Sequence, residues 1–141
     1  MTTTGGDRGS AVIETVIVVP AFLLFVLLIV AGGRIMLAQQ AVQAAAADAA
    51  RTASISRTQA AAEHAGRAGA AASLTNQGLR CSSEQVSVDT HGFGSPVGTP
   101  AKIVATVTCQ VDLFDLTVPG IPGSRRITAT MTSPLDTYRE R

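Results

Sequence analysis

The chain has 141 residues, a net charge of +1 and only 15% charged residues. This length allows at most one modest domain beside a membrane anchor. The near-neutral charge gives no basic patch of the kind that binds nucleic acid. Aromatic residues make up 4% of the chain and tryptophan is absent, so we expect a small and mainly aliphatic core.

An apolar segment near the N-terminus is the most informative part of the sequence. Between Gly9 and Gly33 it carries a single charged side chain, that of Glu14. Since roughly 20 apolar residues cross a bilayer as a helix, this segment predicts one membrane span over residues 10–33. An ionised carboxylate inside a span costs on the order of 2–3 kcal/mol on insertion scales, so Glu14 is a candidate functional residue.

Three interpretations of this segment compete. A secretory signal peptide has a shorter apolar core followed by a small-residue cleavage site, and no Ala-x-Ala site follows near Ala31. A plain single-pass anchor fits the length, with Glu14 snorkelling back to the headgroups. A prepilin-type signal has a short polar leader that ends in glycine, then a helix whose fifth residue is glutamate. Gly9, Ser10 and Glu14 have this spacing, and we favour this interpretation.

The prepilin interpretation gives Glu14 a physical role. Cleavage after Gly9 would remove residues 1–9 as a leader and expose the α-amine of Ser10 as a positive charge. Glu14 could then pair with the freed amine of a neighbouring subunit. A buried carboxylate is tolerable with such a partner, which would also fix the axial register of neighbouring helices. Further along the span, Pro20 should kink the helix.

Residues 34–55 continue the helix beyond the span as a stalk. Small and apolar residues recur there every three or four positions and form one stripe: Ile35, Ala38, Val42, Ala45, Ala49 and Ala53. Residues 10–52 would form a helix of about 65 Å, of which roughly half projects beyond the bilayer. Two alternatives stay open for the stripe: it covers the chain's own head, or it contacts another subunit.

Residues 56–141 predict a small extracytoplasmic head that begins with a second helix. The segment from Ser56 to Gln59 resembles a capping box, which would open a helix from Arg57 to about Ser73. Gly66 and Gly69 weaken this helix, and Asn76–Gly78 ends it.

Alternating apolar and polar residues then predict three strands, at 85–89, 102–111 and 125–132. The connecting loop contains Pro119–Gly123, and Ser133 with Pro134 stops the last strand. We expect an α+β fold in which the alanine-rich helices cover one face of a three-stranded antiparallel sheet. The threonine-rich faces of the strands would meet solvent or a partner.

The two cysteines, Cys81 and Cys109, lie in strand-like, turn-rich sequence well after the span. In a cytosolic protein such a pair is more often two buried thiols, whereas in an exported segment it favours a disulfide. We expect the bridge, which would close a loop of about 29 residues and stabilise the head by about 3–4 kcal/mol.

The sequence gives no reason to expect catalysis. His64 and His91 could be combined with the cysteines into a metal site on paper, but metal-ligand spacings such as CxxC or HxxxH are missing. Nucleophile elbows, P-loops and dinucleotide fingerprints are missing as well. We therefore expect no enzyme, no metal site and no cofactor.

Several motifs together resemble the TadE-like family of bacterial pseudopilins. They are Ser10–Glu14, Val19–Leu24, Gly32–Arg34, Gln39–Ala41 and Ala49–Arg51. The resemblance is close over residues 8–53 and continues beyond them only in layout. It implies a membrane-held minor pilin of a tight-adherence (Flp) pilus system, type IVb-like, cleaved by a prepilin peptidase between Gly9 and Ser10.

The resemblance also implies partners and a location. The partners would be the membrane, other pilins and pseudopilins, the pilus assembly platform and the prepilin peptidase; no nucleic acid is expected. The chain would cross the inner membrane once, with its N-terminus in the cytoplasm and its head outside. The alternative is a permanently anchored extracytoplasmic binding or structural module that is not cleaved. A secreted soluble protein beginning near residues 31–47 is a third hypothesis.

Overall fold

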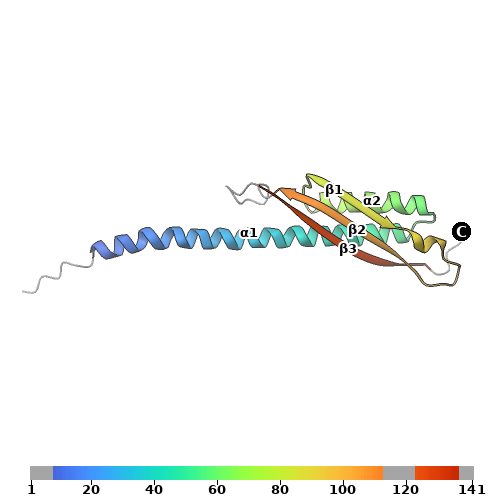
Figure 1. The fold of residues 1–141 in the computed structure, drawn as a ribbon, viewed down its shortest axis with the longest axis horizontal. Helices are drawn as coiled ribbons and strands as arrows, with labels where there is room; N and C mark the ends of the chain where they lie inside the picture. The colour runs from blue at the N-terminus through green and yellow to red at the C-terminus, as the bar shows by residue number, and fades with distance from the viewer. Residues whose placement is uncertain (1–7, 113–122, 137–141) are drawn as a thin grey trace, which may run out of the picture.

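A computed structural model of the chain shows a long helix with a small head at its C-terminal end (Figure 1). The structure describes residues 8–112 and 123–136, with side chains from residue 14 onward. The helices are α1 (Arg8–Ser54), α2 (Gln59–Asn76) and the short 3-10 helix η1 (His91–Gly94). The strands are β1 (Ser83–Asp89), β2 (Ala101–Asp112) and β3 (Ser124–Leu135). This arrangement confirms the predicted α+β fold class.

Helix α1 has 47 residues and is therefore about 70 Å long at 1.5 Å per residue. It continues through Pro20, and the kink expected there stays a prediction. Its second half is rich in alanine, the strongest helix former. At the C-terminal end, the Ser54 hydroxyl donates to the Arg51 carbonyl at 2.9 Å and the Ser56 hydroxyl to the Thr52 carbonyl at 3.2 Å. These bonds satisfy carbonyl groups of the last turn that have no partner within the helix.

Helix α2 begins at Gln59 rather than at the predicted Arg57. Its N-cap is Thr58, whose hydroxyl oxygen accepts a hydrogen bond from the Ala61 amide at 3.2 Å. The predicted capping box at Ser56 was wrong because the Ser56 hydroxyl serves the end of α1 instead. The predicted end at Asn76–Gly78 is confirmed: Gly78 has a φ of +67°, a conformation that glycine adopts without a steric penalty.

The three strands form an antiparallel sheet in the order β1-β2-β3. Alternate side chains of β2 are fully or almost fully buried, and they are Ile103, Ala105, Val107, Cys109 and Val111. On the opposite face, the hydroxyls of Thr106 and Thr130 lie 3.0 Å apart, and those of Thr108 and Thr128 lie 3.1 Å apart. The predicted apolar and threonine-rich faces are both confirmed.

Strand β3 extends beyond its predicted end. The sequence prediction stopped it at Ser133 and Pro134, but β3 continues to Leu135, and Pro134 pairs with Lys102. That prediction was wrong because β3 lies at the edge of the sheet, where a strand tolerates a residue without an N–H. Leu135 is buried, so the extension adds to the core. Of the predicted loop 119–123, residues 119–122 lie outside the described part of the chain.

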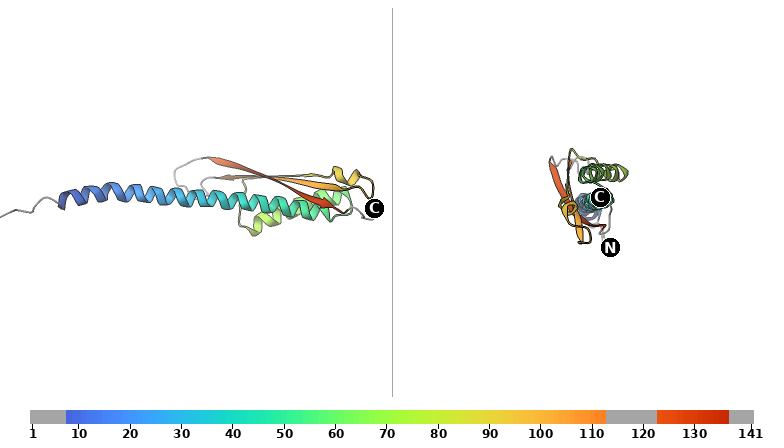
Figure 2. Two further views of the ribbon diagram at one scale, coloured as in Figure 1. Left: turned by 90° about the horizontal axis from the view of Figure 1, so that it is seen from below. Right: turned by 90° about the vertical axis from the view of Figure 1, so that its right-hand side faces the viewer.

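Helices α1 and α2 lie on the same side of the sheet (Figure 2). The main core cluster joins α1, α2, β2 and β3, and α1 contributes Ala38, Val42, Ala45, Ala46, Ala49 and Ala50 to it. Each alanine projects only a methyl group, so the helix backbone can approach the sheet closely and leave few voids. Of the two alternatives for the α1 stripe, the structure therefore shows the first: it covers the chain's own head.

Two glycines of α2 face α1 and β1 where space is short. A Cβ atom at Gly66 would lie 2.8 Å from Val88 Cγ2 and 3.3 Å from the Ala49 carbonyl oxygen. At Gly69 it would lie 2.7 Å from Thr52 Oγ1, and this hydroxyl is also 3.1 Å from the Ala65 carbonyl oxygen across the two helices. The glycines that weaken α2 as an isolated helix thus permit its close contact with α1.

We predict that Gly66→Ala destabilises the head although alanine favours helices. Alanine gains about 1 kcal/mol in helix propensity, but forcing a methyl group into a filled core costs about 1–3 kcal/mol. The expected net loss is about 1 kcal/mol, measured as faster hydrogen exchange of the β2 amides in the full chain in detergent. Gly33→Ala is the control, because a Cβ there meets nothing within 4 Å. A more stable Gly66→Ala variant would contradict this packing.

Candidate functional site

The first half of α1 lies outside the head with its side chains uncovered. Every side chain from Glu14 to Val30 is exposed, and the large apolar ones include Phe22, Leu23, Leu24, Phe25, Leu27, Leu28 and Ile29. Soluble monomers rarely expose contiguous apolar patches larger than a few hundred Å². Lipid or other protein must therefore cover this half of the helix.

The same segment meets the physical requirements of a membrane span. Within the described residues, one helix is long and apolar enough, Glu14–Ser54, and its most apolar window has a mean hydropathy of 2.9 and no buried residues. A core helix of a soluble protein would instead bury such a window. The twenty residues from Glu14 to Gly33 rise about 30 Å along the axis, which matches the hydrocarbon thickness of a bilayer.

The residues of the predicted processing site lie at the start of this helix. Gly9 and Ser10 fall in the first turn of α1, which begins at Arg8. Glu14 follows Ser10 by about one turn, or roughly 6 Å along the axis, and its side chain is exposed. Leader residues 1–7 lie outside the described part of the chain. Processing at Gly9 and a register role for Glu14 stay predictions.

Helix α1 passes from the exposed segment into the head without a break. Cβ atoms at Gly32 and Gly33 would have no neighbour within 4 Å, whereas Ala38 is already buried in the core. The side chains of α1 change from exposed to buried within about one turn after Arg34. The orientation of the head is therefore set by the helix itself and not by a flexible linker.

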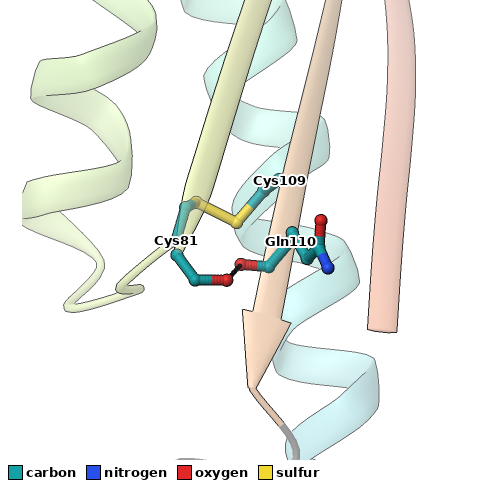
Figure 3. The surroundings of a disulfide bond; sticks show 4 residues. Cys81, Cys109 and Gln110 are labelled. Atoms are coloured by element: carbon teal, nitrogen blue, oxygen red, sulfur yellow. Dashed lines mark hydrogen bonds between the residues drawn. A yellow bond between two sulfur atoms is a disulfide. The ribbon is translucent and has the colours of Figure 1, made fainter. Parts of the chain in front are cut away.

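The predicted disulfide between Cys81 and Cys109 is present, with Cα atoms 5.3 Å apart (Figure 3). Cys81 lies just before β1 and Cys109 is fully buried in β2. Beside the bridge, the Ser82 amide and hydroxyl both donate to the Gln110 carbonyl, at 2.7 and 3.0 Å. The bond thus fastens the start of β1, an edge strand, to the centre of the sheet.

The two histidines lie on separate elements. His64 is exposed on α2, and His91 is exposed in η1, where its Nε2 lies 4.0 Å from Asp89 Oδ1. Over residues 8–112 and 123–136, no three side chains of the His, Cys, Asp and Glu types are grouped as metal ligands would be. Because the two cysteines are bonded to each other, neither offers a thiolate to a metal.

One feature was not recognised from the sequence. An open cavity of about 470 Å³ lies beside the point where α1 leaves the head, and its lining includes Arg34, Leu37, Gln40, Gln77, Arg80 and Val111. Arg34 and Arg80 are far apart in the chain, and each resembles an ordinary exposed arginine in the sequence. Only the packing of α1 against the turn after α2 brings them to one cavity.

These features define the class of the chain: a small disulfide-bonded α+β head on a continuous helix that can anchor it in a membrane. Residues 9–51 match the family model for the TadE-like protein, as the sequence motifs suggested. The matched segment contains the whole exposed half of α1 from Glu14 and most of its buried half. Comparisons with curated proteins and with solved structures gave no match.

We predict that Cys81→Ala lowers the stability of the oxidised head by about 3–4 kcal/mol, the loop-closure value for about 29 residues. Cys81 is only half-buried, so the substitution removes the bridge with little loss of packing. Urea unfolding of the full chain in detergent measures the difference. Adding a reductant to the wild-type chain should abolish the difference from Cys81→Ala. An equal stability of the wild-type chain and Cys81→Ala without reductant would show that the bridge does not stabilise the head.

Proposed function

We propose that the chain is a membrane-anchored TadE-like pseudopilin that takes part in assembling a tight-adherence (Flp-type) pilus. One observation carries the proposal: α1 is divided into an exposed apolar half with one carboxylate and a buried half that belongs to the head core. The match to the TadE-like family model spans both halves. In this proposal the chain is a structural subunit, and it has no enzymatic activity and needs no cofactor.

The division of α1 suits a subunit that moves from a bilayer into an assembly of helices. Its apolar side chains can contact lipid tails or the equally apolar surfaces of other helices without any change in the head. Its partners would be other pilins and pseudopilins and the assembly platform. A helix that is continuous with the head would carry the head to a defined position in the assembly.

In the proposed assembly Glu14 pairs with the amine of a neighbouring subunit. The amine is that of Ser10 after a prepilin peptidase has removed residues 1–9. A buried ion pair of this kind contributes more to register than to stability, because desolvation offsets much of the attraction. Without the amine, the exposed Glu14 would bring an unpaired charge into an apolar helix contact.

The proposed orientation places the N-terminus in the cytoplasm and the head outside the inner membrane. The Cys81–Cys109 disulfide supports this orientation because such bonds persist in oxidising compartments. The packing of α1 argues against a secreted form that begins near residue 47, because such a chain would lack Ala38, Val42 and Ala45 of the core.

We predict that co-expression with a prepilin peptidase shortens the chain to a form that begins at Ser10. Intact-mass measurement and N-terminal sequencing identify this form. Gly9→Ala should block the cleavage, because the leader must end in glycine for this class of signal. Gly6→Ala, a matched change within the leader, should leave it intact. An unprocessed mass in the wild-type chain, unaffected by Gly9→Ala, would contradict the processing claim.

We also predict that Glu14→Leu leaves membrane insertion intact but strongly reduces assembly into the pilus system. Leucine removes the cost of a carboxylate in the span, so insertion should be at least as efficient, while the intersubunit ion pair is lost. Membrane fractionation and co-purification with other pilins give the two measurements.

A double variant distinguishes a specific ion pair from general damage. If Glu14 pairs with the Ser10 amine, then Gly9→Ala and Glu14→Leu remove the same interaction, and the double variant should assemble no worse than either single one. Normal assembly of Glu14→Leu would instead favour the permanently anchored binding or structural module.

A further inference from the structure

Four arginines gather at the end of the head that faces the membrane. Arg34 is the first charged residue after the span, and Arg80 lies between α2 and β1. Arg125 and Arg126 lie at the start of β3, where Arg126 pairs with Gln110 near the end of β2. Figure 1 shows that this end of the sheet points toward the exposed half of α1.

Arg34 and Arg80 share the open cavity of about 470 Å³ beside α1. Gln40 and Gln77 also line it, and the described lining residues include neither aspartate nor glutamate. Arg125 and Arg126 line a second cavity on the other side of α1. The only carboxylates that the described residues place at this end of the sheet are Glu84 and Asp112. Among the described residues, this end therefore carries four guanidinium groups and two carboxylates.

The position of the first cavity along α1 fixes its depth relative to a bilayer. If the hydrocarbon core covers Glu14 to Gly33, about 30 Å of helix, Arg34 lies at the level of the lipid headgroups. Leu37, 65% exposed, belongs to the same cavity wall. The cavity therefore offers cationic donors and an apolar wall at the depth where a phospholipid has its phosphate and the beginning of its acyl chains.

We propose that this cavity binds the phosphate of an anionic phospholipid in the leaflet below the head. Each guanidinium can donate two parallel hydrogen bonds to phosphate oxygens, and clustered basic residues at a membrane surface favour anionic over zwitterionic lipids. The bound lipid fixes the rotation of α1 about its axis, so the head presents a defined side along the membrane. The proposal rests on the membrane anchoring described above and not on the role in pilus assembly.

The test uses the purified full-length chain in a non-ionic detergent with equal amounts of phosphatidylglycerol and phosphatidylcholine of matched acyl chains. Native mass spectrometry counts the lipids that stay bound. The wild-type chain should retain phosphatidylglycerol in preference, and R34Q/R80Q should lower this preference by roughly tenfold. R34K/R80K, which keeps the charge but loses the paired hydrogen bonds, should have a preference between those of R34Q/R80Q and the wild-type chain.

R51Q/R57Q is the matched control, because it removes the same charge from two exposed arginines at the far end of the head. It should bind like the wild-type chain. Slow hydrogen exchange of the β2 amides, as in the wild-type chain, shows that each variant has folded. An unchanged preference in R34Q/R80Q, or equal retention of both lipids by the wild-type chain, would overturn the proposal.

A competition experiment separates the lipid from a free anion. Inorganic phosphate at millimolar concentration should leave phosphatidylglycerol bound, because Leu37 and α1 hold its acyl chains as well. Displacement by inorganic phosphate would mean that the cavity is a site for a free anion, which contradicts the lipid proposal. Pilus partners are absent from these measurements. A negative result for lipid binding would therefore not contradict the predicted cleavage at Gly9. Conversely, an uncleaved chain could still show the lipid preference.

Discussion

The packing of the alanine-rich half of α1 against the sheet is the interaction on which the rest of the structure depends. The sheet has three strands, and its apolar face would be open to water without α1 and α2. Alanine side chains keep the contact close, and glycines at positions 66 and 69 let α2 approach in the same way. A core made of such small side chains buries little apolar area per residue, so we expect the Cys81–Cys109 bond to contribute a large share of the stability.

This packing determines how the head relates to the membrane. One face of α1 between Ala38 and Ala53 belongs to the head core, and the exposed apolar segment ends only one turn before it. Helix α1 is continuous between its exposed and its buried half, so a rotation or a shift of the span moves the head with it. A subunit built this way suits an assembly in which contacts between helices place the heads. For the same reason, charged groups at the two ends of the span, Glu14 and Arg34, can set the position of the whole molecule.

The sequence allowed the main elements of the fold to be predicted because their signals are local. The apolar run, the helical stripe through Val42 and the alternation around Val107 each depend on neighbouring residues alone. The bridge followed from two cysteines in a segment expected to be exported. The prediction failed where two elements compete or meet. Ser56 and Thr58 are both good N-cap residues, but the Ser56 hydroxyl bonds to the last turn of α1, so Thr58 caps α2. Pro134 stops a central strand but not an edge strand such as β3.

The candidate site was predictable in part. Glu14 stands out because a charge in an apolar run is costly, and the family match agrees with the segment around it. Whether the alanine stripe faces the chain's own head could not be decided from periodicity, since both alternatives require the same pattern. The shared cavity of Arg34 and Arg80 was not predictable, because it arises from the tertiary contact between α1 and the turn that follows α2.

The central claim is that the exposed half of α1 contacts other pilin subunits during assembly. Photo-crosslinking in cells that carry the pilus system tests it most directly. A photoreactive residue at Leu24, 68% exposed on the span, is compared with one at Val97, 61% exposed on the head. The account predicts adducts between Leu24 and other pilin or pseudopilin chains, lost on Gly9→Ala, and few from Val97. Lipid adducts alone at Leu24, unchanged by Gly9→Ala, would show that the helix is a plain anchor.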